Sequence, residues 1–194
     1  MRWKRDFPGV LPLMFYSRPG NTVIAMFQFL QAKDEAKLDA DLKKKFDALP
    51  NKNDVMLLEV LDPATGKTDG AIFVDTGNYS FFGNNAIAAA DTVLLYDTHN
   101  RTLVYSLKSG QQKGKVVGKF RAISAAGDQM LVENEAGVAE LYSTSTLQPL
   151  EHYTFPARIT HAEFVSTEKL LVLAADQTLY EISLPATTQS ASAQ

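Results

Sequence analysis

The sequence predicts an all-β chain: a β-propeller-like array of about four four-stranded antiparallel blades, with one inserted amphipathic helix. Two observations carry this prediction. Short runs rich in Val, Leu, Tyr, Phe and Thr alternate with turn residues along most of the chain, as strands do. One such run recurs with spacings of 44, 37 and 40 residues, counted between Asp62, Ser106, Ser143 and Ser183. A period of about 40 residues in an all-strand chain is typical of propeller blades.

Composition limits the class of protein. A chain of 194 residues with 45% hydrophobic residues can build one domain with a core. The net charge of −3 lacks the basic field of a nucleic-acid binder, so no nucleic-acid partner is expected. The absence of cysteine excludes disulfides, thiolate metal sites and a cysteine nucleophile. The apolar runs are too short to cross a bilayer, so no membrane insertion is expected.

Turn residues divide the chain into four predicted blades, and the strands within them differ in pattern. Residues 23–27 and 170–174 are continuously apolar, which predicts strands covered on both faces. Residues 140–143 alternate in polarity, which predicts a strand nearer to solvent. The predicted blades lie near 10–77, 79–118, 120–156 and 159–184.

A helix is predicted over 31–49, inserted between the second and third strands of the first blade. Leu38, Leu42 and Phe46 lie four residues apart, on one face of a 3.6-residue period. Acidic residues come early and Lys43–Lys45 come late, an order that suits the helix dipole. Two interpretations remain open: the apolar stripe packs on the propeller rim, or the helix is a lid or a partner-binding element.

The last blade is predicted to lack its fourth strand, because the strand pattern ends at Leu184. A single domain over 1–184 would then be followed by a small, polar and disordered tail over 185–194. Three hypotheses address the unfinished blade. Residues 2–7 supply the missing outer strand and close the ring, the chain is the C-terminal part of a larger propeller, or two chains associate through the open edge.

Residues 55–184 resemble β-propellers of the WD40, YVTN and quinoprotein-like type. The resemblance rests on the period and on the turn Asp62-Pro63-Ala64-Thr65-Gly66-Lys67, with an echo at Lys108-Ser109-Gly110-Gln111. No blade carries the Gly-His…Trp-Asp signature of strict WD40 repeats. In quinoprotein-like propellers the resemblance implies a Trp after the Gly, whereas Thr68-Asp69-Gly70 follow here and Trp3 is the only Trp. This departure argues against a quinone cofactor.

No catalytic residue, cofactor site or metal ligand is predicted. His99, His152 and His161 do not show the spacing of metal ligands. Neither a G-x-S-x-G nucleophile elbow nor a Gly-rich phosphate loop occurs. The sequence therefore favours a protein that is not an enzyme.

The connections between second and third strands share one face of a propeller, and loops on a rigid scaffold often carry function. We therefore predict a non-catalytic binding or scaffold propeller that presents this face to a protein or a small ligand. The alternatives are a quinoprotein-like or hydrolytic enzyme with its site in the central funnel, and an inactive half of a larger propeller. The residues of the predicted face are Leu38, Leu42, Phe46, His99, Arg101, Glu135 and Asp176.

Overall fold

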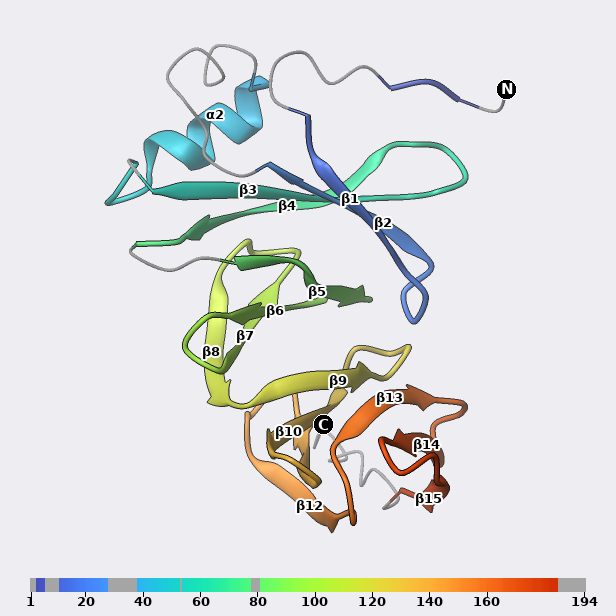
Figure 1. The fold of residues 1–194 in the computed structure, drawn as a ribbon. Helices are drawn as coiled ribbons and strands as arrows, with labels where there is room; N and C mark the ends of the chain where they lie inside the picture. The colour runs from blue at the N-terminus through green and yellow to red at the C-terminus, as the bar shows by residue number, and fades with distance from the viewer. Residues whose placement is uncertain (1–2, 6–10, 28–37, 53, 78–80, 185–194) are drawn as a thin grey trace, which may run out of the picture.

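A computed structural model describes residues 3–5, 11–27, 38–52, 54–77 and 81–184, without the side chains of 81–85. Four antiparallel sheets follow one another along the chain, and each is an up-and-down meander. Figure 1 shows blade one at the top, blade two below it, and blades three and four at the bottom. The predicted propeller-like array is confirmed, including the three-stranded last blade.

Blade one contains β1 (Leu13–Ser17), β2 (Thr22–Phe27), β3 (Val55–Leu61) and β4 (Thr68–Asp75). Blade two contains β5 (Phe81–Ala89), β6 (Thr92–Asp97), β7 (Arg101–Ser106) and β8 (Gln112–Val117). Blade three contains β9 (Lys119–Ile123), β10 (Gln129–Glu135), β11 (Val138–Ser143) and β12 (Pro149–Thr154). Blade four contains β13 (Ile159–Phe164), β14 (Lys169–Ala174) and β15 (Leu179–Ser183).

Neighbouring blades pack face to face through separate apolar clusters. Blade one meets blade two around Leu58 and Leu95, and blade two meets blade three around Leu94 and Met130. A third cluster joins blades three and four. Because side chains alternate between the two faces of a strand, every internal blade is apolar on both sides. Within the described residues the array does not close, so blade one and blade four each have one face without a neighbouring blade.

Blade one covers its outward face with the inserted helix α2 (Ala40–Asp47). The helix begins at Asp39, whose carboxylate accepts a hydrogen bond of 2.8 Å from the Leu42 backbone N–H, as N-cap residues do. Phe46 is fully buried, and its ring centroid lies 5.6 Å from that of Phe73 in β4. Of the two interpretations of the helix, packing onto the propeller is confirmed. The helix predicted over 31–49 is shorter in its described part, because it spans Ala40–Asp47 and leaves out residues 38–39 and 48–49. Residues 28–37, which include the predicted start at 31, lie outside the described residues. The remaining members of this cluster are Phe27, Leu38, Leu42, Leu49, Val55, Leu57 and Ala71.

Residues 3–5 cover another part of the same face. The Trp3 indole N–H donates to the Pro63 carbonyl at 2.8 Å, and the ring lies so close to Gly66 that a Cβ there would be 2.5 Å from it. Arg5 Nη2 lies 2.6 Å from Glu59 Oε2. The hypothesis that residues 2–7 complete blade four is therefore wrong for the described part of that segment, because it lies on blade one.

Side-chain hydroxyl groups of one blade donate hydrogen bonds to backbone carbonyl groups of the next blade. Ser17 Oγ donates to the Ala88 carbonyl at 2.6 Å, which joins blade one to blade two. Thr92 Oγ1 donates at 2.8 Å to the carbonyl of Gly127, in the β9–β10 turn of blade three. A Cβ on Gly127 would lie 2.4 Å from the Ala89 carbonyl oxygen, so this approach between blades requires glycine. These bridges set the spacing of the blades beyond what apolar packing alone provides.

Candidate functional site

The predicted face does not offer the apolar stripe of the helix. Leu38, Leu42 and Phe46 belong to the cluster beneath α2, and Phe46 has no exposed surface. The helix therefore turns these residues toward its own blade, with Phe46 fully buried and Leu38 and Leu42 partly buried. The sequence alone could not show this, because an amphipathic stripe looks the same whether it meets its own chain or another.

The remaining residues of the predicted face lie in or beside the connections between second and third strands of their own blades. His99, Glu135 and Asp176 are exposed. The Asp176 carboxylate accepts a 3.0 Å hydrogen bond from the Thr178 backbone N–H, which shapes the β14–β15 turn. Equivalent positions in successive blades place these residues at the same end of the array, and their role in binding stays a prediction.

Arg101 has a structural role. Its Nε and Nη2 lie 2.8 and 2.5 Å from Oδ2 of Asp97, a carboxylate with no exposed surface. The other Asp97 oxygen accepts the backbone N–H groups of His99 and Arg101, at 3.0 and 3.1 Å. A buried carboxylate needs such donors, so the pair stabilises the β6–β7 turn.

A central cavity of about 280 Å³ lies where the first strands of the blades converge. Apolar side chains of β5, β9 and β13 line it, and charged groups stand among them. Arg18, in the β1–β2 turn, lies 3.0 Å from Glu163 of β13 and so connects blade one to blade four. His161 Nε2 lies 3.7 Å from the same carboxylate oxygen, Oε2.

Arg121 also lines the cavity, and its charge is matched by Glu133. Arg121 Nε donates to Glu133 Oε2 at 2.7 Å. The buried Oε1 of Glu133 accepts the backbone N–H of Gly137 at 2.9 Å and that of Ile159 at 2.7 Å. Because Ile159 begins β13, this carboxylate ties blade three to blade four. Its hydrogen bonds are all structural, which does not favour a role as an acid or base.

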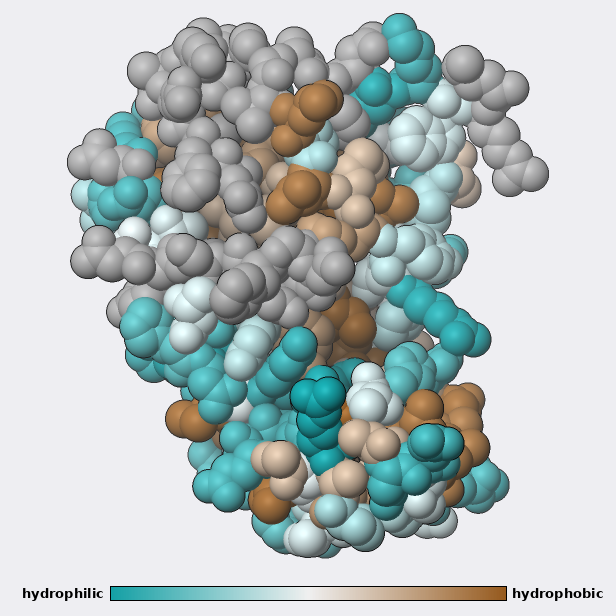
Figure 2. All heavy atoms as spheres, in the orientation of Figure 1, coloured by the Kyte–Doolittle hydropathy of each residue, from teal (hydrophilic) through white to brown (hydrophobic). Residues whose placement is uncertain are grey.

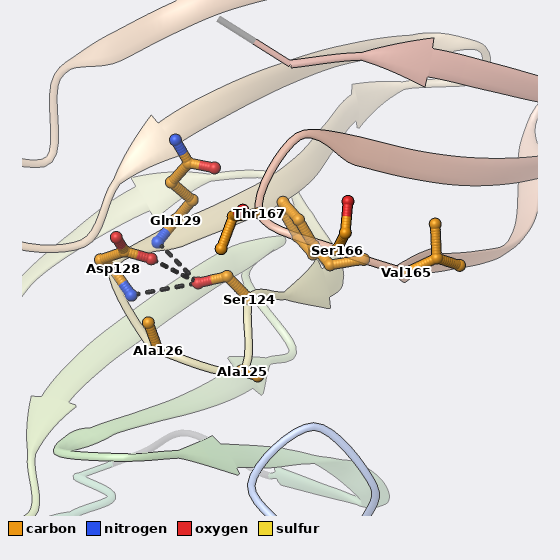
Figure 3. Close-up of a pocket in the computed structure, with 9 residues that line it drawn as sticks. Ser124, Ala125, Ala126, Asp128, Gln129, Val165, Ser166 and Thr167 are labelled. Carbon is orange, nitrogen blue, oxygen red and sulfur yellow. Dashed lines mark hydrogen bonds between the residues drawn. The ribbon is translucent and has the colours of Figure 1, made fainter. Parts of the chain in front are cut away.

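A second cavity, of about 220 Å³, lies between the β9–β10 turn and the β13–β14 turn (Figure 3). The Ser124 hydroxyl donates to Asp128 Oδ1 at 2.6 Å. The Ser124 hydroxyl oxygen in turn accepts the backbone N–H groups of Asp128 and Gln129, each at 3.1 Å (Figure 3). Ser124 thus closes a turn, and no histidine lines this pocket to activate it.

Among the residues that the structure describes, no group of three His, Asp or Glu side chains is placed to hold a metal ion. None of the helices within those ranges has the length and apolar character needed to cross a membrane.

The outward face of blade four is the surface that the sequence did not reveal. We use this name for the side chains of His161, Glu163, Leu171, Leu173, Leu179 and Glu181, which the strand register places on one side of the sheet. Leu173 is 36% exposed, Leu179 is 62% exposed, and Val165 in the adjoining turn is 50% exposed. Figure 2 shows apolar atoms in brown over this end of the molecule.

This exposure corrects a prediction. The apolar run 170–174 was expected to be covered on both faces, whereas Leu170 and Val172 are buried against blade three and Leu173 is exposed. Leu173 and Leu179 are direct partners in the β14–β15 register. They form a non-hydrogen-bonded pair, the type in which side chains lie closest. Glu163 and Glu181 flank Leu171 in the next row.

An unpaired hydroxyl lies at the rim between blades three and four. Tyr153 Oη of β12 is buried and has no hydrogen-bond partner among the described residues. Burial raises the pKa of Tyr153, and the charge of Glu151 acts in the same direction. The phenol therefore stays protonated and available as a donor.

No model of a known protein family and no curated protein sequence matches the chain. Among solved structures, the RRP9 WD40 repeats are similar at 12% identity, with 48% of this chain and 32% of that chain covered and a TM-score of 0.44. Sqt1 of Saccharomyces cerevisiae is similar at 13% identity, with coverages of 66% and 40% and a TM-score of 0.45. The computationally designed Ika8 is similar at 13% identity, with coverages of 88% and 45% and a TM-score of 0.49. The chain spans less than half the length of each of these three proteins, and such likeness concerns the fold alone.

Proposed function

We propose that this chain is a non-catalytic, protein-binding scaffold, and that its binding surface is the outward face of blade four. One observation carries the proposal: Leu173 and Leu179 are adjacent and exposed on a sheet face whose counterpart in blade one is covered by α2. Contiguous exposed apolar side chains on a folded protein commonly mark an interaction site.

The composition of this face supports the proposal. An apolar centre formed by Leu171, Leu173 and Leu179 is bordered by charged or polar groups, of which Lys169 and Glu181 pair at 2.9 Å. Protein interfaces combine an apolar centre with a polar rim in this way. The ionisable groups deeper in the molecule, such as Glu133 and Asp97, have structural partners instead.

A photo-crosslinking amino acid at Leu173, in the cells that make the protein, tests the proposal. We expect one dominant protein adduct, because a specific partner would lie against this face. The matched control is Val117, a 65% exposed aliphatic residue in β8. We expect no dominant adduct from that position. The same adducts at both positions, or none at Leu173, would overturn the proposal.

A second candidate is a small-ligand site in the central cavity. It is favoured by the convergence of Arg18, His161 and Glu163 beside apolar walls, because ligand sites combine apolar surface with few polar groups. Fragment screening by NMR tests it. We expect a bound fragment to shift the NMR signals of the Ala122 and Ala162 methyl groups. Phe120→Trp places a larger side chain in the cavity wall, and we expect it to abolish these shifts. Failure to find such a fragment would argue against this candidate.

A further inference from the structure

Blade four ends in a free strand edge. In the described part of the chain, β15 pairs with β14 alone, whereas the third strand of every other blade is covered by a fourth. Ala174 N–H donates to the Thr178 carbonyl at 3.0 Å, and Leu184 N–H donates to the Glu168 carbonyl at 2.8 Å. These two bonds fix the alternation of the ladder. The backbone N–H and C=O groups of Leu179, Glu181 and Ser183 therefore point to the free edge.

The surface beside that edge is aromatic. The ring centroids of Tyr153 and Phe155 are 6.5 Å apart, and those of Phe155 and Tyr180 are 5.2 Å apart. Tyr153 and Tyr180 are half-buried, and they belong to the margin of the cluster between blades three and four. The unpaired Tyr153 hydroxyl lies at this margin. A strand added to β15 would approach these rings.

We propose that an extended segment of a partner protein adds to β15 as the fourth strand of blade four. The inference rests on the protein-binding function proposed above, and it assigns the segment that binds. Main-chain hydrogen bonds would hold such a strand, and alternate side chains would select it.

Blades two and three indicate the chemistry of that segment, whereas β4 of blade one is largely buried and has α2 on its outward side. The fourth strands β8 and β12 are largely exposed, with Val116 and Tyr153 as half-buried apolar contacts. The partner segment is therefore polar at most positions and carries an aliphatic or aromatic residue facing blade three.

Two other occupants fit less well. The sequence 185–194 contains no Val, Leu, Ile, Phe, Tyr or Trp, so it has no large side chain to cover the rings. In a second copy of this chain, a two-fold antiparallel pairing centred on β15 would place Glu181 opposite Glu181. Like charges in directly opposed positions destabilise a strand pair.

The first test is Glu181→Pro, read through the crosslinker at Leu173. Proline removes one edge-facing N–H and leaves the ladder with β14 intact. We expect the adduct yield to fall about tenfold, the effect of one lost hydrogen bond with its partner left unsatisfied. Lys115→Pro is the control, because Lys115 faces the free edge of β8 in the same way. An adduct unchanged by Glu181→Pro would overturn strand addition, whereas a parent protein without an adduct would overturn the proposed function instead.

Amide exchange in the purified protein separates the possible occupants. Without a partner, we expect rapid exchange at Leu179, Glu181 and Ser183. An extended peptide of alternating valine and threonine, with a lysine at each end, should slow exchange at these three amides and not at Lys115. Protection that vanishes when 185–194 is deleted would assign the edge to this chain. A doubled solution mass that Glu181→Pro abolishes would assign it to a second copy. Either result would overturn the proposal.

Discussion

Blade one and blade four each have a face without a neighbouring blade, and the two faces are treated in opposite ways. In blade one, α2 buries Phe46 against β4, while Trp3 and Arg5 cover the β3–β4 turn and Glu59. In blade four, Leu173 and Leu179 remain exposed on the corresponding side. Arrays of repeats need a cap where the last repeat meets solvent. In the described residues, the apolar cluster of blade one is thus covered by α2, whereas the corresponding face of blade four is exposed.

The largest effect is expected where the cap meets the sheet. Phe46→Ala removes a fully buried ring and should lower the free energy of unfolding by about 3–5 kcal/mol. Denaturant titration measures the change. Leu179→Ala in blade four is the matched control, and we expect it to stay within about 0.5 kcal/mol of the parent because Leu179 is exposed. Equal losses in the two variants would contradict the difference between the two ends.

Glu133→Gln tests how blade four is held to the array. The amide keeps one acceptor for Gly137 and Ile159 but leaves Arg121 without its counter-ion, so we expect a loss of about 2–3 kcal/mol. Amide exchange should quicken in β13 and β14 more than in β3. Glu151→Gln, at an exposed position, serves as the control. If Glu133→Gln instead speeds amide exchange equally in all blades, the Glu133 carboxylate does not specifically stabilise blade four.

Trp3→Ala is expected to cost about 1–2 kcal/mol, because the indole is half-buried and donates one hydrogen bond to Pro63. Since Trp3 is the only tryptophan, its fluorescence reports directly on the cap. We expect the emission to shift together with the unfolding of blade one. Tyr16→Ala, which removes a 60% exposed ring from the same blade, should cost less. A larger loss from Tyr16→Ala would mean that residues 3–5 contribute little to the cap.

The smallest effect concerns pH. Burial raises the pKa of Glu59 above its usual 4.5, and the opposing influence of Arg5 is smaller. The folded protein then holds this proton more tightly than the unfolded chain. The resulting stability is present below the unfolded pKa and is lost as pH rises through the folded pKa. Relative to Glu59→Gln, the parent should therefore lose stability from acidic to neutral pH, as thermal unfolding at several pH values would measure. A relative gain over this range would contradict the burial of Glu59 beneath the cap.

Local patterns in the sequence were enough to predict the blades. Turn residues and apolar runs act over a few positions, so the predicted first blade over 10–77 encloses β1 to β4, which end at Asp75. The unfinished last blade followed in the same way, from a strand pattern that stops at Leu184.

Contacts between distant segments could not be predicted from those patterns. Trp3 contacts a turn that lies about sixty residues later in the chain, and no local sequence pattern predicts such a contact. The apolar stripe that includes Phe46 and the apolar run 170–174 are two further examples of contacts that the sequence pattern could not predict. Apolar residues indicate that something should cover them, yet the stripe meets its own blade while Leu173 remains exposed.

The Arg18–Glu163 pair is a direct contact between blade one and blade four. Its two charges belong to the first and the last blade, and the Arg18 side chain is 76% exposed. Dissolved ions screen such a pair far more than they affect the apolar clusters between neighbouring blades. Raising the salt concentration should therefore weaken this contact while each blade stays folded. We expect the distance between a label on blade one and a label on blade four to increase with salt.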